Sequence, residues 1–136
     1  MRLLLMDLIS RFIGYHKLCV FPFYTFIQSY LTAHQQHVTR ILVFLTQACH
    51  DFVPPEELFP LVRVIADNFV NDHSSPEIVA LGINTISEIF ARIPLLFEAD
   101  ELQPLILELV EMKANKDKGV AVASRNFLNV RFGEDC

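Results

Sequence analysis

Four basic side chains near the carboxyl end of the sequence have the types and spacing of a phosphate-binding cluster: Lys113, Lys116, Lys118 and Arg125. The three lysines fall in a predicted turn, and Arg125 lies in the helix predicted to follow it. Lysines beside a helix N-terminus are a natural contact for phosphate, because the first amides of a helix also attract anions. A turn between two repeats must also be polar, so a merely solvated turn is the alternative. We expect RNA or a partner protein to bind at these four residues.

Histidines and one cysteine raise the question of a metal site. His34 and His37 would share one helical face, and Cys49 and His50 lie one helix further on. Zinc uses such ligands, but no CxxC or HExxH spacing supports a site here. We expect the histidines to lie in a turn and at a helix end, and we predict no metal and no cofactor.

Catalytic chemistry has little support. The sequence has no GxSxG motif, no P-loop and no glycine-rich phosphate loop, since its four glycines stand apart. Adjacent carboxylates occur at Glu56-Glu57 and Asp100-Glu101, where we expect helix starts and solvent. An acid–base pair would have to converge on a cleft. We predict that the protein is not an enzyme and has no small-molecule substrate.

An aromatic-rich stretch covers residues 21–26 and closes at Tyr30. Such rings could stack on nucleic-acid bases. Aromatic residues at helical spacing belong more often to a core, however, so we expect Phe23 and Phe26 to be buried.

Composition narrows the class of protein. Of the 136 residues, 52% are apolar and 20% are charged, with a mean hydropathy of +0.36. The longest uncharged apolar run, near 18–27, is well short of the roughly 20 residues of a membrane span. Three cysteines without a CxxC pair fit a reducing compartment. The net charge of −5 is uneven, because residues 51–112 sum to −10 and lie between segments of +3 and +2. This pattern argues against one uniform nucleic-acid groove but permits local basic patches.

The elements that must position these residues are helices. Apolar residues recur at i, i+3, i+4 and i+7 through most of the chain, and alternating strand patterns are absent. Prolines in predicted first turns and possible N-caps at Ser74 or Ser75 and at Asp117 indicate the starts, and Gly14 would end the first helix. We predict seven helices, near residues 2–14, 21–31, 36–51, 55–72, 76–93, 99–112 and 117–131.

A repeat appears when alternate helices are overlaid. Val38, Val79 and Val120 lie 41 residues apart. The same step joins Ile41, Gly82 and Ala123; Leu45, Ile86 and Phe127; and Ala48, Ile89 and Val130. A step of 36 residues would align Leu5, Ile9 and Phe12 of the first predicted helix with Ile41, Leu45 and Ala48. A period near 40 with paired helices is typical of HEAT or armadillo repeats. We therefore predict an all-α helical-repeat solenoid of three to four hairpins in one segment, with repeats near 1–34, 35–74, 75–115 and 116–136, the last incomplete.

The first predicted helix is apolar around most of its circumference, which is typical of a buried helix. Solenoid ends need a polar capping face, which this helix lacks. We interpret the chain as an internal piece of a longer array, and we expect it to self-associate through this uncapped helix.

Several short strings, in order and spacing, resemble the SDA family of eukaryotic proteins, named for severe depolymerisation of actin. Two of the strings are Gly82-Ile83-Asn84 and Lys116-Asp117-Lys118. The others fall at residues 8–11, 16–18, 34–35, 38–42, 47–50, 53–56, 68–72, 86–92, 113 and 120–125. The resemblance covers about residues 8–125, nearly the whole chain.

The resemblance implies a role in maturation and nuclear export of the large (60S) ribosomal subunit precursor. It implies a nuclear and nucleolar location, no enzyme chemistry, and a pre-ribosomal particle of ribosomal RNA and ribosomal or assembly proteins as the partner. A link to actin organisation is also attached to the family. The alternative is a generic HEAT-type protein-binding adaptor, in transport or linked to the cytoskeleton, without RNA contact. The acidic stretch 51–112 would favour a basic protein partner.

Overall fold

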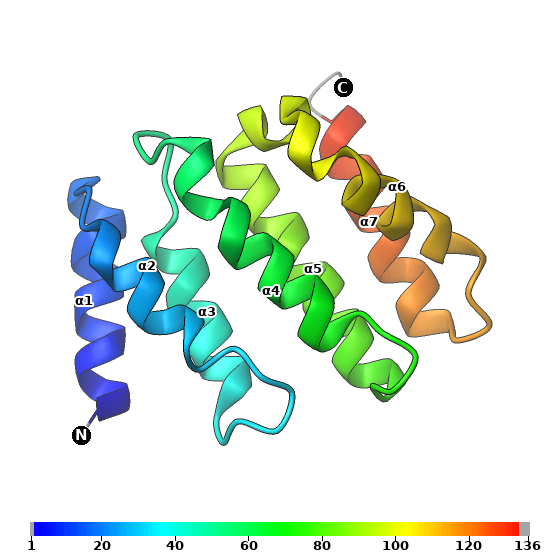
Figure 1. Cartoon of the computed structure of the whole chain (residues 1–136), viewed down its shortest axis with the longest axis horizontal. Coiled ribbons are helices and arrows are strands. Elements are labelled where there is room, and N and C mark those ends of the chain that lie inside the picture. The colour runs from blue at the N-terminus through cyan, green and yellow to red at the C-terminus, as the bar shows by residue number, and fades with distance from the viewer. Residues whose placement is uncertain (1, 134–136) are drawn as a thin grey trace.

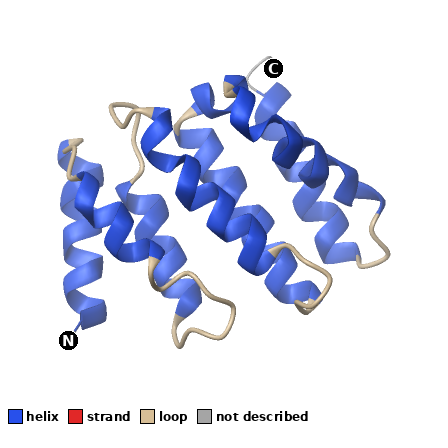
Figure 2. Ribbon diagram, in the orientation of Figure 1, coloured by secondary structure: helices blue, strands red, loops and turns tan. Residues whose placement is uncertain are grey.

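The computed structural model describes residues 2–133, and all regular structure in that range is helical (Figure 2). The helices are α1 Arg2–His16, α2 Phe21–Gln28, α3 Val38–Ala48, α4 Phe59–Phe69, α5 Pro76–Arg92, α6 Gln103–Glu111 and α7 Lys118–Gly133. Short 3₁₀ helices are η1 Pro55–Leu58, η2 Pro94–Glu98, η3 Asp100–Leu102 and η4 Met112–Ala114. The prediction of an all-α repeat fold is confirmed.

Successive helices run in opposite directions and form two layers (Figure 1). Helices α2, α4 and α6 lie in front, and α1, α3, α5 and α7 lie behind them. Within the rear layer α1 packs on α3, α3 on α5, and α5 on α7. This stacking gives each hairpin a neighbour for its apolar face, as a solenoid requires.

The 41-residue repeat marks the core face of three helices. Of the twelve residues in the four repeated sets, only Val130 is half-buried, and the other eleven are buried. The repeated face is therefore the one that α3, α5 and α7 turn to the continuous core. Gly82 belongs to this face because a Cβ there would come within 2.7 Å of the Phe69 Cβ on α4.

The predicted start signals hold for several helices, but α4 and α6 begin four residues later than predicted, at Phe59 and Gln103, because Pro55 and Asp100 start the 3₁₀ helices η1 and η3. Proline occupies one of the first two positions of α2, α4, α5 and α6, where a missing amide hydrogen costs nothing. The Ser75 hydroxyl accepts the Ile78 amide at 3.4 Å, and the Asp117 carboxylate accepts the Val120 amide at 3.2 Å. Both N-cap predictions are thus confirmed.

The predicted core face of α1 is wrong by one residue. Leu5, Ile9 and Phe12 are 52%, 42% and 52% exposed. The buried side chains are Met6, Ser10 and Ile13, which lie 35 residues before Ile41, Leu45 and Ala48. Because α1 is apolar all round, its apolar pattern does not select a face.

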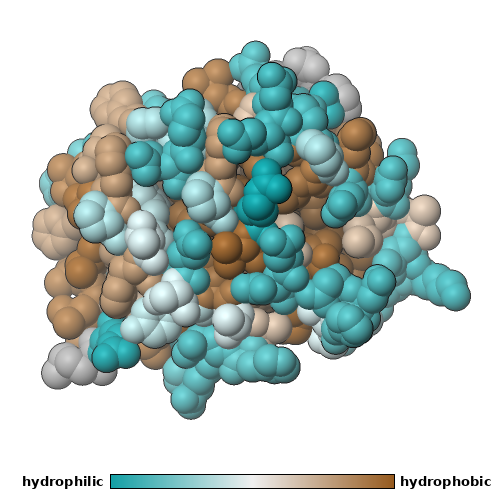
Figure 3. Space-filling model, viewed as in Figure 1, coloured by the Kyte–Doolittle hydropathy of each residue, from teal (hydrophilic) through white to brown (hydrophobic). Residues whose placement is uncertain are grey.

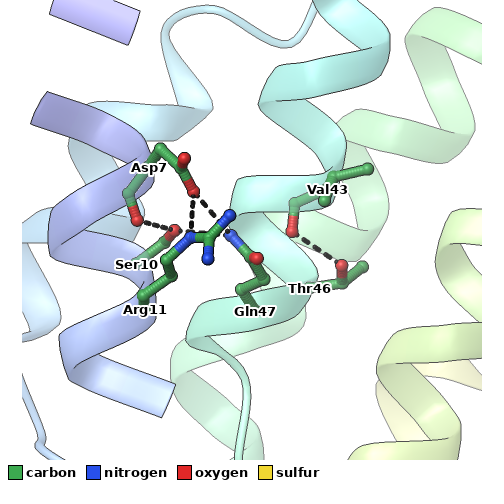
Figure 4. A network of polar contacts seen from close by, with 6 residues as sticks. All are labelled: Asp7, Ser10, Arg11, Val43, Thr46 and Gln47. Atoms are coloured by element: carbon green, nitrogen blue, oxygen red, sulfur yellow. Dashed lines mark hydrogen bonds and ion pairs between the residues drawn. The ribbon is translucent and has the colours of Figure 1, made fainter. Parts of the chain in front are cut away.

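Polar contacts to α3 select the face instead. The Gln47 amide donates to Ser10 Oγ at 2.9 Å and to Asp7 Oδ1 at 3.3 Å (Figure 4). Gly14 lies inside α1 and does not end it, so that prediction is also wrong. A Cβ at Gly14 would overlap the Gln47 carbonyl oxygen, so only glycine permits this approach of the two backbones.

Helix α1 ends two residues later than predicted. Lys17 takes the left-handed conformation, with φ of 52°, and the Leu18 amide donates to the Ile13 carbonyl oxygen at 3.0 Å. This is the hydrogen bond of a Schellman ending.

The aromatic stretch is divided between core and surface. Phe23 and Tyr24 are buried, and the Tyr24 hydroxyl donates to the Ala48 carbonyl oxygen at 2.8 Å. Phe26 is 44% exposed, and its ring meets Tyr30 edge-on with centroids 5.3 Å apart. The prediction is right for Phe23 and wrong for Phe26, because the helix turns position 26 away from α4 and α3.

Candidate nucleic-acid interface

The three predicted lysines lie together at the turn between α6 and α7. Lys113 is in η4, Lys116 is in the turn itself, and Lys118 is the first residue of α7. Arg125 follows seven residues later on the same helix, about 10 Å along its axis. All four side chains are exposed, and none of them forms an ion pair within the described residues. The cluster is therefore accessible to a phosphate.

The N-terminus of α7 contributes less to this site than the sequence suggests. Its Val120 amide already binds the Asp117 carboxylate, and the Asp117 amide donates to Asn115 Oδ1 at 2.8 Å. A carboxylate at the helix start competes with phosphate for the same positive end of the helix dipole. Any phosphate contact here depends on the lysine side chains.

Charge differs between the two layers over the described residues. The rear layer, α1, α3, α5 and α7, carries an excess of basic residues: Arg2, Arg11, Arg40, Arg92, Lys118, Arg125 and Arg131 against Asp7, Glu77 and Glu88. The front helices α2, α4 and α6, with η1, η2 and η3, are acidic: Glu56, Glu57, Asp67, Glu98, Asp100, Glu101, Glu108 and Glu111 against Arg63. The two faces would therefore attract partners of opposite charge.

Two of the rear-layer arginines are paired along their own helices. Arg11 Nε lies 2.7 Å from Asp7 Oδ1, and Arg92 Nε lies 3.0 Å from Glu88 Oε1. The hydrogen bond from Arg11 holds the pKa of Asp7 below its usual value. A third pair, Lys17 with Asp51 at 3.0 Å, lowers the pKa of Asp51 in the same way.

The candidate metal ligands do not converge. His34 and His37 are exposed in the loop before α3. His50 is buried, with Nε2 2.6 Å from the Leu18 carbonyl oxygen and Nδ1 accepting the Phe52 amide at 3.2 Å. Burial raises the pKa of the Cys49 thiol to about 12, which disfavours the thiolate that binds zinc. No cluster of three or more metal-ligating side chains occurs among the residues described.

The adjacent carboxylates also do not form a site. Glu56 and Glu57 lie at the start of η1, and Asp100 and Glu101 lie at the start of η3. All four are exposed. Their pairing in the sequence therefore reflects helix starts in solvent.

Comparison with known proteins decides the family. Residues 1–116 match the SDA1 HEAT-repeat family. The chain belongs to this SDA1 family. Over 129 residues, 95% of the chain, it is 46% identical to the protein SDA1 homolog of Nematostella vectensis and 47% identical to protein sda1 of Schizosaccharomyces pombe. Over 93% of the chain it is 43% identical to the SDA1 homolog of Dictyostelium discoideum. The chain spans only 16–18% of the length of these relatives.

The SDA1-family chain has a second conspicuous surface, the apolar outer side of α1. Leu5 is 52% exposed and Ile9 is 42% exposed. The other exposed apolar residues of α1 are Leu4, Leu8, Phe12 and Tyr15. Apolar residues gather at the left edge of the molecule, the end where α1 lies (Figure 3). No helix among the described residues is both long and apolar enough to cross a membrane.

We expect this chain to self-associate with increasing concentration, because a contiguous exposed apolar surface favours association. Sedimentation velocity would detect the change. The double substitution Leu5→Glu/Ile9→Glu should keep the chain monomeric. The matched control is Leu95→Glu/Leu107→Glu, which adds the same charge at positions 59% and 60% exposed outside α1. Equal suppression by both variants would mean that net charge, and not the α1 surface, governs association.

Proposed function

We propose that the protein is a non-catalytic scaffold that acts in maturation and nuclear export of the large ribosomal subunit precursor, in the nucleolus and nucleus. The family assignment supports this role, which is attached to SDA proteins in general. Because the chain spans a small part of its relatives, we assign to it a docking role within that process.

The opposite charges of the two layers carry the proposal. A rear layer with Arg40, Lys118 and Arg125, none of which forms an ion pair among the described residues, is continued by Lys113 and Lys116 and suits the phosphates of ribosomal RNA. The acidic front layer suits basic proteins, to which ribosomal proteins belong. A two-layered helical solenoid with one face for each partner would hold RNA and protein together during assembly.

The lysines would provide affinity and position, without reading the RNA sequence. Each ammonium is a point charge on a flexible stem, and it can reach phosphates in more than one geometry. Such contacts fix the orientation of a protein on RNA but leave base recognition to other groups.

The triple substitution Lys113→Gln/Lys116→Gln/Lys118→Gln tests the RNA contact. We expect it to weaken binding of ribosomal RNA fragments equally across sequences. The slope of log affinity against log salt should fall by roughly two to three, because each phosphate contact contributes about 0.7 to 0.9. Thermal stability should hardly change, since the three side chains are exposed. Arg63→Gln, on the acidic layer, is the single-residue control.

Gradient co-sedimentation with large-subunit precursors completes the test. Full retention of the triple-lysine variant, with an unchanged salt slope, would contradict the RNA contact at this turn. The acidic layer supports a second candidate, a protein-binding adaptor without RNA contact. That candidate predicts the opposite result, in which Glu56→Gln/Glu57→Gln/Glu101→Gln abolishes retention and the lysine variant has no effect.

A further inference from the structure

A groove of about 550 Å³ opens where the carboxyl ends of α1, α3 and α5 meet. It is lined by apolar residues of α1, by Gln47 of α3, and by one arginine from each of α1 and α5. The lysine turn lies at the amino end of α7. Because the rear helices are parallel, the groove and the lysine turn are at opposite ends of that layer (Figure 1). The groove is thus separate from the interface proposed above.

The floor of the groove is fixed. Gly14 has no side chain, and its backbone lies against the Gln47 carbonyl oxygen. The Gln47 side chain donates to Ser10 and Asp7, which ties α1 to α3 (Figure 4). A ligand would therefore meet a surface that is already formed, which lowers the entropic cost of binding.

Two guanidinium groups are held in place with their outer ends free. Arg11 and Arg92 both line the groove. Each is bound through Nε to the carboxylate four residues earlier, Asp7 or Glu88. The terminal nitrogens of both make no hydrogen bond within the described part of the chain. A guanidinium oriented in this way can receive a carboxylate with two parallel hydrogen bonds.

The wall beside the arginines is apolar and exposed. Leu8, Phe12 and Tyr15 are 51%, 52% and 86% exposed, and they occupy neighbouring positions on α1. The Phe12 ring stacks on His16 with centroids 5.6 Å apart. Tyrosine and arginine are among the residues enriched at the energetic hot spots of protein interfaces.

We propose that this groove binds an extended segment of a partner protein in which an aspartate or glutamate lies next to a large apolar residue. The carboxylate bridges the terminal nitrogens of Arg11 and Arg92, and the apolar side chain covers Phe12 and Tyr15. A nucleic acid is less suited to the groove. Asp7 and Glu88 neutralise the two arginines, so the site attracts a single oriented carboxylate more than a dense line of phosphates.

Selection from a random dodecapeptide library displayed on phage provides the probe. The target is this chain with Leu5→Glu/Ile9→Glu, which is designed to prevent self-association without altering a residue that lines the groove. We expect enriched peptides to share an acidic residue within two positions of Phe, Leu, Ile or Met. The best peptide, synthesised with a fluorophore, is then titrated by anisotropy.

The decisive variant is Arg11→Gln/Arg92→Gln. It should lower the affinity for the peptide about tenfold or more, because hydrogen bonds between charged groups are stronger than those between neutral ones. Tyr15→Ser should weaken it as well, and this largely exposed side chain is not needed for folding. The control Arg2→Gln/Arg63→Gln removes the same charge outside the groove and should leave the affinity unchanged.

Three results would overturn the inference. One is the absence of an acidic-apolar consensus among the selected peptides. Another is equal binding by the wild type and the Arg11→Gln/Arg92→Gln variant. The third is competition by a single-stranded RNA dodecamer that itself requires the two arginines. None of these results bears on the lysine turn, whose salt slope is measured in variants that keep Arg11 and Arg92.

Discussion

Replacement of Phe90 by alanine is expected to lower the free energy of unfolding by about 3 to 5 kcal/mol. Phe90 on α5 and Phe127 on α7 are both 0% exposed, with ring centroids 5.3 Å apart. Phe97 of η2 meets the two rings at 4.7 and 5.5 Å. Truncation would leave a cavity where three elements join and would remove two edge-to-face ring contacts. Since domains are commonly stable by only about 5 to 15 kcal/mol, much of the stability would be lost.

Urea unfolding followed by circular dichroism measures this loss. Phe52→Ala is the matched control, because the Phe52 ring is 62% exposed and lies outside the core. We expect the control to change stability by about 0.5 kcal/mol or less. The stability loss caused by Phe90→Leu should lie between those of Phe90→Ala and Phe52→Ala, because leucine keeps part of the buried volume. A Phe90→Ala variant as stable as Phe52→Ala would mean that α7 does not pack on α5 as described.

The sequence predicts a helix face well where only one face is apolar. In α3, α5 and α7 the repeated apolar positions alternate with Arg40, Glu88 and Arg125 on the outer side, so a single register remains. In α1 several faces are equally apolar, and the choice is made by contacts that no periodicity reveals. Those contacts are the Gln47 amide with Ser10 and the close approach at Gly14.

The two candidate sites also differ in how much of each the sequence reveals. The lysine turn is visible in the sequence because its members are neighbours along the chain. The sequence indicates the Asp117 carboxylate as a cap at the start of α7, but its competition with phosphate becomes clear only from the geometry. The sequence does not reveal the groove, because Arg11, Gln47 and Arg92 come from three separate helices. One sequence signal was available, the i,i+4 acid–arginine pair that occurs in both α1 and α5.

The one-residue correction in α1 leads to a second stability test. Ile13→Ala should lower the free energy of unfolding by about 2 to 5 kcal/mol, because the Ile13 side chain is 1% exposed in the core between α1 and α3. Ile9→Ala removes the same atoms from the same helix, but Ile9 is 42% exposed. Its expected change is about 0.5 kcal/mol or less, and the higher helix propensity of alanine offsets part of any loss.

The comparison of these two variants is independent of helix propensity, since both exchange isoleucine for alanine inside α1. The step of 36 residues predicts the reverse order, because it places Ile9 opposite Leu45 at the centre of the core face and leaves Ile13 at the edge of that face. A larger loss for Ile9→Ala than for Ile13→Ala in urea unfolding would therefore restore that register. Self-association must be excluded in this experiment, because an oligomer that covers the exposed face of α1 would also raise the measured free energy of unfolding. Both variants should be measured at several protein concentrations, and only a difference that does not vary with concentration reports the packing of α1 on α3.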